Sequence, residues 1–283
     1  MKIDQDLLTD FVARYPAQPA TAFWRGIEID VLAQAGIPDG LGLDLGCGDG
    51  ILTDILFKRT GRKPRLVGID PDLLEIEAAR RYDFYERLHA VGGADIPEKD
   101  ATFDYVISNS VLEHIPELEP VIEEVGRVLK PGGKFYFTVP CPNFHNNLSG
   151  SWTPGAQRQD YLRKLDQRLA HFNYLTPEDW TAMCDRHEMD VDEVRGYLGK
   201  SATQRWETLS RMSGGLLHSL SLGSKRPIEI QRALKLRSFQ NAAAFPRGVA
   251  SVMSKVIGAG MGNEDDASNP SCLLVIGHRR CES

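Results

Sequence analysis

The chain has 283 residues, of which 42% are hydrophobic, enough to bury one sizeable core or one domain with a large insertion. Its net charge of −6 excludes a general nucleic-acid binder, but not a local basic patch. Five scattered cysteines without a CxxC motif indicate reduced thiols and a cytoplasmic protein. The polar start MKIDQDLLTD predicts no signal peptide, and no apolar run approaches the ~18 residues of a membrane span.

Short apolar runs alternate with helical patterns between positions 41 and 140, which is typical of a parallel sheet covered by helices. The predicted strands are Leu41–Leu45, Arg65–Asp70, Tyr85–Ala90, Phe103–Ser108 and Gly133–Pro140. The helices predicted between them are Ile51–Arg59, Asp72–Arg80 and Leu118–Leu129. The motif KPGG at Lys130–Gly133 predicts a turn that ends the last of these helices.

A further helix and two strands are predicted towards the end of the chain. The cap TPED opens a helix near Pro177–His187, and a strand follows near Asp190–Tyr197. The run SCLLVIG at Ser271–Gly277 predicts the last strand. Roughly seventy residues separate these two strands, too many for a plain loop in a compact domain.

The stretch between the last two strands has its own charge and pattern. From Lys200 to Lys255, ten Lys or Arg oppose only Glu207 and Glu229, so this stretch carries +8 and the rest of the chain −14. The glycine pair at positions 214 and 215 would weaken a helix here. Gly262–Ser271 predicts an exposed linker. An amphipathic helix is nevertheless predicted, because one helical face collects Trp206, Leu209, Leu216, Leu217 and Leu220.

Three glycines at alternate positions follow the first strand, in LDLGCGDG at Leu43–Gly50. Glycine lets the backbone turn sharply and lets a ligand come close, and such strand–loop–helix junctions bind nucleotides. The dinucleotide fingerprint G-x-G-x-x-G is one residue longer than the spacing from Gly46 to Gly50. Asp70, at the end of the second strand, would hydrogen-bond a ribose in either case. The loop alone therefore leaves NAD and another nucleotide open.

Four sequence blocks in order decide between these nucleotides. LDLGCGDG is followed by VGIDPD at Val67–Asp72, then by GGADIPEKDATFDYVISNSVLEHI at Gly92–Ile115 and LKPGGKFYFTVP at Leu129–Pro140. With these blocks the chain resembles the class I S-adenosylmethionine-dependent methyltransferases of the methyltransferase-11-like, small-molecule or glycan type. The resemblance covers about residues 20–200 and the final strand. It implies an α/β, Rossmann-like doubly wound seven-stranded sheet with an antiparallel last strand, and S-adenosyl-L-methionine as cofactor.

The resemblance also assigns cofactor contacts to individual residues. Asp44 would meet the ammonium group, directly or through water, and Asp70 would accept hydrogen bonds from both ribose hydroxyls. Asp95 would accept from the adenine amino group, Ile96 would pack on the ring, and Asn109 would lie near the methionine end. An arginine on the helix before the first strand would pair with the cofactor carboxylate. The predicted cofactor-binding set is Arg25, Asp44, Gly46, Cys47, Gly48, Asp70, Pro71, Asp95, Ile96 and Asn109.

Several of these residues also have a purely structural interpretation. Asp70 could only cap the helix that follows it, and Asp95 could be a turn residue. Arg25 and Glu28 could form a surface ion pair at i,i+3 spacing. Asp104, at the start of a strand, favours a structural cap over a ligand.

The stretches after the fourth and fifth strands bear on metal binding and catalysis. Some relatives bind a divalent metal through E-x-x-E-H, but Ser110 replaces the first carboxylate here, so no metal is expected. The predicted catalytic residue is His171, as the base that deprotonates a substrate hydroxyl; a histidine that only hydrogen-bonds locally is the alternative. The segment near the expected substrate entrance offers Tyr161, Arg168, His171 and Tyr174.

The expected reaction is methyl transfer to oxygen. The sulfonium of S-adenosylmethionine becomes a thioether when it gives up its methyl group, and this thioether is a good leaving group. The enzyme therefore mainly aligns the acceptor with the methyl group. The stretch SNSVLEHI after the fourth strand lacks an NPPY motif, which disfavours exocyclic amines of adenine or glutamine. We therefore expect O-methylation of a small-molecule, saccharide or lipid-linked acceptor.

The resemblance implies a cofactor-binding domain at 1–198 and 269–283 and a basic helical insertion at 199–268. As a lid, this insertion would meet an acidic or phosphate-bearing acceptor or an anionic membrane surface; a solvated helical cap is the alternative. The protein is expected to be cytoplasmic, with peripheral membrane contact open, and no nucleic acid is expected as a partner. Two other functions stay open: a catalytically silent S-adenosylmethionine-binding protein and an NAD-dependent oxidoreductase. The oligomeric state stays open as well.

Overall fold

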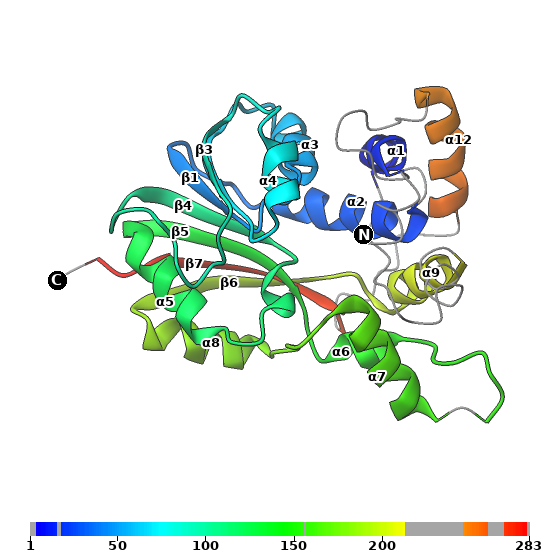
Figure 1. Cartoon of the computed structure of the whole chain (residues 1–283). Coiled ribbons are helices and arrows are strands. Elements are labelled where there is room, and N and C mark those ends of the chain that lie inside the picture. Colours follow the sequence, from blue (N-terminus) through cyan, green and yellow to red (C-terminus); the bar gives the residue numbers. More distant parts are fainter. Residues whose placement is uncertain (1–3, 16–17, 156, 213–245, 260–268, 282–283) are drawn as a thin grey trace. The chain divides into compact units, whose positions relative to one another are not determined.

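The computed structural model describes residues 4–15, 18–155, 157–212, 246–259 and 269–281 (Figure 1). Its chain divides into two compact units. The first unit consists of Met1–Glu28, Asn143–His171 and Leu198–Ser271, and the second of Ile29–Pro142, Phe172–Tyr197 and Cys272–Ser283. The domain boundaries predicted at 198/199 and 268/269 stay a prediction.

The second unit contains a seven-stranded sheet with the order β3-β2-β1-β4-β5-β7-β6. Its pairs are parallel except those of β7, which runs antiparallel to both β5 and β6. This is the predicted α/β, Rossmann-like doubly wound sheet with an antiparallel last strand, and the fold prediction is confirmed. The strands are β1 Leu41–Leu45, β2 Arg65–Ile69, β3 Tyr85–His89, β4 Phe103–Asn109, β5 Leu129–Pro140, β6 Met189–Tyr197 and β7 Cys272–Arg279.

The predicted helices between the strands are present, with ends that differ from the prediction by at most one residue. Local signals explain their starts: the Asp72 carboxylate accepts the Leu74 N–H, and Thr176 and Asp179 form a capping box. In the second unit the helices that follow β1 are α3 Ile51–Thr60, α4 Leu73–Ala79, the short η1 Leu112–His114, α5 Glu119–Val128 and α8 Pro177–Arg186. The remaining described helices are α1 Gln5–Arg14, α2 Pro19–Ala33, α6 Asn143–Asn147, α7 Arg158–Leu169, α9 Lys200–Ser210 and α12 Arg247–Gly258.

The predicted turn at KPGG is wrong, because β5 already begins at Leu129. Phe103 of β4 pairs with Leu129, but Tyr105 pairs with Lys134, so extra residues of β5 bulge out of the ladder. Gly132, with φ +76°, supplies the left-handed backbone that this excursion needs. KPGG is therefore a bulge inside a strand and not a connection between a helix and a strand.

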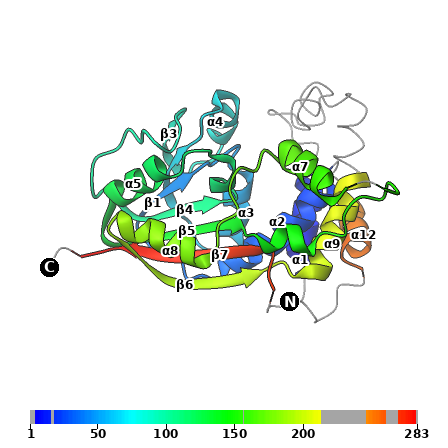
Figure 2. The ribbon, with the colours of Figure 1, turned by 90° about the horizontal axis from the view of Figure 1, so that it is seen from below.

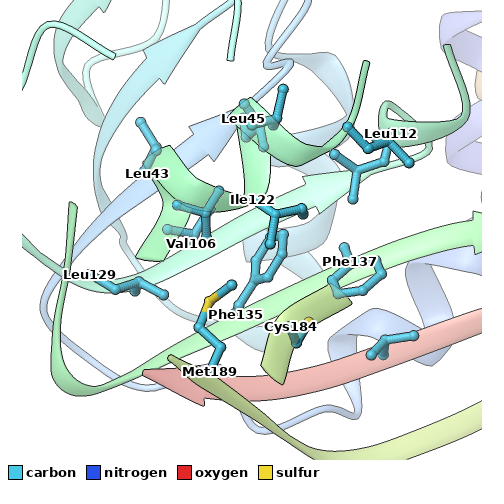
Figure 3. Close-up of a cluster of buried hydrophobic side chains, with 14 of the residues drawn as sticks. Leu43, Leu45, Val106, Leu112, Ile122, Leu129, Phe135, Phe137, Cys184 and Met189 are labelled. Carbon is cyan, nitrogen blue, oxygen red and sulfur yellow. The ribbon is translucent and has the colours of Figure 1, made fainter. Parts of the chain in front are cut away.

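The core of the second unit lies between the sheet and helices α5 and α8. Both helices pack on one face of the sheet (Figures 1 and 2), and their apolar side chains meet those of β1, β4 and β5 (Figure 3). Side chains alternate along β1, so Leu43 and Leu45 enter this core while Asp44 faces the other side, where it meets Thr53 of α3. Strand β1 is thus buried on both faces, which is typical of an inner strand of a parallel sheet.

The first unit is helical in its described part. Helix α12 packs on α1, where the buried hydroxyls of Thr9 and Ser254 hydrogen-bond at 2.8 Å. The rings of Trp24, Phe144 and Trp206 meet edge to face at centroid distances of 5.3 to 5.7 Å. Trp206 thus lies on the buried face of α9, whereas Leu216, Leu217 and Leu220 of the predicted amphipathic helix and most of the predicted linker lie outside the described residues. Among the helices that the structure describes, none is both long and apolar enough to span a bilayer.

Candidate active site

The loop after β1 is fastened to the end of the neighbouring strand β2. The N–H groups of Gly46 and Cys47 both donate to the Ile69 carbonyl, at 2.9 and 3.0 Å. Strand order reverses between β1 and β4, and such a switch point at the carboxyl ends of parallel strands is where α/β folds bind ligands. The predicted glycine loop therefore lies at the expected edge of the sheet.

Two glycines of this loop are needed for different reasons. Gly46 has φ +77°, and a Cβ atom there would lie 2.4 Å from Cγ2 of Val111, so no side chain fits. Gly48 has φ +52°, but a Cβ atom there would meet no atom within 4 Å. The Gly48 backbone therefore borders open space, which a ligand can approach closely.

Asp70 lies directly after β2 and is held by two backbone donors. Its Oδ2 accepts the N–H of Gly48 at 3.0 Å, and its Oδ1 accepts the N–H of Asp72 at 2.9 Å. These two bonds fix the orientation of the Asp70 carboxylate at the edge of the loop. Asp72, and not Asp70, is the side chain that caps α4. The capping alternative for Asp70 is therefore wrong.

Asp44 is a buried carboxylate under the glycine loop. Its Oδ2 accepts the hydroxyls of Thr53, at 2.6 Å, and Tyr85, at 2.5 Å. Burial raises the pKa of Asp44 from 3.8 to about 6, although these two hydrogen bonds favour the charged form. The nearby Asp70 carboxylate also raises this pKa, and the role of Asp44 towards an ammonium group stays a prediction.

The other predicted cofactor residues of the second unit surround this loop. Cys47 is buried beneath it, and burial raises the pKa of its thiol well above the usual range. Pro71 is exposed directly after Asp70. Asp95 is exposed, whereas Ile96 is 3% exposed, belongs to the core, and donates its N–H to Glu124 at 2.9 Å. The stacking of Ile96 on an adenine ring stays a prediction.

Asn109 ends β4 and is held against β5. Its Oδ1 accepts the Thr138 hydroxyl at 2.7 Å, and the next residue, Ser110, donates its N–H to the Thr138 carbonyl at 3.0 Å. Asp104, at the other end of β4, accepts the Leu41 N–H and the Lys130 ammonium, at 2.8 and 2.6 Å. This confirms the structural interpretation of Asp104.

Two predicted site residues belong to the first unit. Arg25 donates to the carboxylate of Glu28, which is fully buried, so the pair is not a solvated surface pair. His171 is half-buried, and its ring lies 6.2 Å from that of Phe144. Their roles towards the cofactor carboxylate and a substrate hydroxyl stay predictions.

The sequence analysis missed the residues that support this site. Thr53 and Tyr85 hold the Asp44 carboxylate, and Val111 closes the space beside Gly46. Thr53 lies in the first turn of α3, directly after the glycine loop. This closeness in sequence could have indicated its contact with Asp44. Tyr85 is 41 positions away from Asp44, and only the pairing of the strands brings it close.

These residues fit S-adenosylmethionine. An oriented carboxylate suits the ribose diol, a buried carboxylate suits the ammonium group, and the bare Gly48 backbone admits the ligand between them.

Replacing Gly48 by alanine should weaken S-adenosylhomocysteine binding by about tenfold or more, because the new methyl group enters the open space at the loop. Gly61→Ala is the matched control: Gly61 also has a positive φ, +67°, with no atom within 4 Å of a Cβ position. Both variants should lose about 1–2 kcal/mol of stability through backbone strain. Calorimetric titration separates them, and equal losses of affinity would contradict the assignment.

Asp44→Asn should make the protein more stable and a weaker binder. With a raised pKa, folded Asp44 keeps a proton between about pH 4 and 6 that the unfolded chain has lost, so its contribution to stability falls as pH rises through this window. The shift from 3.8 to about 6 corresponds to about 3 kcal/mol. We expect a gain approaching this size at pH 8, little change near pH 4, and weaker S-adenosylhomocysteine binding at pH 8.

Urea unfolding of variant and wild type at both pH values measures this difference. Asp104→Asn is the control with the opposite sign, because the partners of Asp104 lower its pKa in spite of burial. That variant should lose stability at pH 8. If Asp44→Asn also lost stability at pH 8, this would contradict the expectation that the buried charge of Asp44 destabilises the folded protein.

Comparisons with known proteins point to methyltransferases. A family model described as a methyltransferase domain matches residues 23–194. Ubiquinone biosynthesis O-methyltransferase of Xanthomonas oryzae pv. oryzae (strain PXO99A) is 25% identical over 179 residues, which cover 60% of this chain and 70% of the relative. Sarcosine/dimethylglycine N-methyltransferase of Halorhodospira halochloris is 30% identical over 210 residues, which cover 66% and 72%.

Solved structures share the fold at low identity. A SAM-dependent methyltransferase from Thermotoga maritima matches with a TM-score of 0.52 at 13% identity, covering 96% of this chain and 100% of that one. The [4+2]-cyclase SpnF matches with a TM-score of 0.52 at 16% identity, covering 90% and 80%. These structures support the fold alone, and the cyclase illustrates that one fold hosts several reactions. The family model spans more than half of the chain, and the chain therefore belongs to the methyltransferase-domain family, as an S-adenosylmethionine-dependent methyltransferase.

Proposed function

We propose that this methyltransferase transfers the methyl group of S-adenosylmethionine to an oxygen atom of a small-molecule acceptor. The observation that carries the cofactor site is the Asp70 carboxylate, oriented by the N–H groups of Gly48 and Asp72 beside open space. The choice of oxygen is supported by the stretch after β4, which lacks an amino-methylation motif, and by the O-methyltransferase relatives.

The protein's part in the reaction is binding and alignment. S-adenosylmethionine supplies an activated methyl group on a sulfonium sulfur. Asp70 would hold the ribose through two hydrogen bonds, Asp44 would attract the ammonium group, and the Gly46–Gly48 backbone would lie against the ligand. Fixing both ends of the cofactor points the methyl group in one direction, and such orientation contributes much of the rate.

Methylation of an amine is the second candidate for the acceptor. The sarcosine/dimethylglycine N-methyltransferase relative, at 30% identity, favours it. An oxygen acceptor such as an alcohol or phenol needs a base, whereas a neutral amine does not.

For the oxygen acceptor, we assign His171 as the base that removes the hydroxyl proton.

The narrower acceptor classes and the membrane contact stay predictions. Most of the basic stretch that motivates a lipid-linked or saccharide acceptor, at 213–245, lies outside the described residues. The NAD-dependent oxidoreductase is not supported, because the family match and the relatives are methyltransferases.

Asp70→Ala should weaken S-adenosylmethionine and S-adenosylhomocysteine binding about 100-fold or more. The reason is the loss of two hydrogen bonds to a charged acceptor, each contributing about 1.5–3 kcal/mol. Asp72→Ala is the matched control: it removes the cap of α4 at a cost of about 1 kcal/mol, with binding nearly unchanged. Calorimetry on both variants, with NAD as a second ligand, makes the comparison. Binding of NAD but not S-adenosylmethionine by the wild type would overturn the proposal.

His171→Asn should lower kcat by roughly 10²- to 10⁴-fold with an oxygen acceptor and leave S-adenosylhomocysteine affinity unchanged. The measurement uses tritiated S-adenosylmethionine and a panel of phenols, catechols and hydroxy acids, with sarcosine and dimethylglycine beside them. His145→Asn is the control, a half-buried histidine of the same unit that pairs with Asp166 at 2.9 Å. Transfer to the amines with none to the hydroxyl compounds would establish the amine acceptor instead.

A further inference from the structure

A cluster of charged and polar side chains joins α7 and α9 within the first unit. Tyr161 and Arg168 lie seven positions apart on α7, so they share one face of that helix. Glu207, Ser210 and the adjoining Arg211 share a face at the end of α9. The cluster therefore contains two guanidinium groups and one carboxylate.

The single carboxylate of the cluster is held by four donors. Glu207 is 2% exposed, and its Oε2 accepts the N–H group of Ser149 at 2.8 Å. Its Oε1 accepts the Gly150 N–H at 3.3 Å, the Tyr161 hydroxyl and the Arg211 guanidinium, the last at 2.7 Å. Among the described residues, the arginine that pairs with Glu207 is therefore Arg211, and Arg168 donates to Ser210 instead.

Arg211 is the partner of that carboxylate. Besides Glu207, it donates to the Gly150 carbonyl and, at 3.0 Å, to the Tyr161 oxygen. Its guanidinium lies over the rings of Trp152 and Tyr161, at 4.8 and 5.1 Å from their centroids. The charges of Glu207 and Arg211 therefore neutralise each other.

Arg168 is the guanidinium of the cluster that no described carboxylate binds directly. Its one hydrogen bond among the described residues is to the Ser210 hydroxyl, at 3.1 Å. Burial lowers the pKa of Arg168, and the nearby Tyr161 and Glu207 offset this only in part. A half-buried cation without an anion costs stability, so a fold keeps it where a ligand supplies the anion.

We propose that Arg168 and the Ser210 hydroxyl form a binding site for an oxyanion, a carboxylate or a phosphate. The guanidinium fork binds such groups through two parallel hydrogen bonds, and a serine hydroxyl adds a third donor. The anion site is argued from contacts within the first unit alone, and it stands independently of the proposed function.

The test titrates the full chain with sodium benzoate and with inorganic phosphate at constant ionic strength, by calorimetry. Arg168→Gln should weaken binding of the preferred anion about tenfold or more, and Arg168→Lys should fall between this variant and the wild type. Arg163→Gln is the matched control: Arg163 lies on the same helix, exposed and paired with Asp160. It should bind both anions as the wild type does. Tighter benzoate binding indicates a carboxylate ligand, and tighter phosphate binding a phosphate-bearing one.

Thermal unfolding supplies a second readout. Without an anion, Arg168→Gln should be at least as stable as the wild type, because it removes a half-buried charge that no described carboxylate binds directly; a purely structural Arg168 would lower the melting temperature instead. The proposal is overturned if the wild type binds neither anion, or if Arg168→Gln binds them equally well. S-adenosylhomocysteine titration of the same samples reports the proposed function separately, since its failure leaves the anion result unchanged.

Discussion

The hydrogen bonds between the loop after β1 and the end of β2 are the constraint on which the site depends. The Ile69 carbonyl accepts hydrogen bonds from the N–H groups of Gly46 and Cys47. The Asp70 carboxylate accepts a hydrogen bond from the N–H group of Gly48. This pattern needs β1 and β2 to be paired in one register, because a shift of one residue would turn every side chain of the strand to the other face. The packed sheet therefore sets the positions of the groups that we propose to bind the cofactor.

The same packing creates a conflict at Asp44. The alternation along β1 that buries Leu43 and Leu45 in the core also buries Asp44 on the opposite face. Thr53 and Tyr85 satisfy one of its oxygens, but the buried charge still raises the pKa to about 6. A charge kept at a cost in stability is typical of binding sites, where the ligand supplies the missing compensation.

The first unit contains a comparable half-buried charge, the cation of Arg168. Counting charges along the chain identifies a basic stretch, but the count does not say which charges are already neutralised. In the folded unit Glu207 accepts backbone N–H groups, Tyr161 and Arg211, and no carboxylate of the described residues pairs with Arg168. Local pairing, and not net charge, therefore decides where an anion would bind.

The sequence by itself determined the features that depend on neighbouring residues. The alternation of apolar runs, the glycine spacing at 46, 48 and 50, the cap at Asp72 and the capping box at Thr176 are local, because backbone conformation and caps act over a few residues. They were enough to predict the α/β fold and to place the glycine loop at the edge of the sheet where we propose that the cofactor binds. Register was the first point where local signals failed: KPGG has the composition of a turn, yet pairing with β4 makes it a bulge.

Only the tertiary structure decided which groups meet. Tyr85 reaches Asp44 across 41 positions, and Asp104 joins the Leu41 N–H to Lys130 through the pairing of three strands. Glu207 collects donors from positions 149 to 211, which leaves Arg168 unpaired by any described carboxylate. Such contacts cannot be read along the chain, because hydrogen-bond capacity and burial depend on distant segments that meet only after the chain has folded.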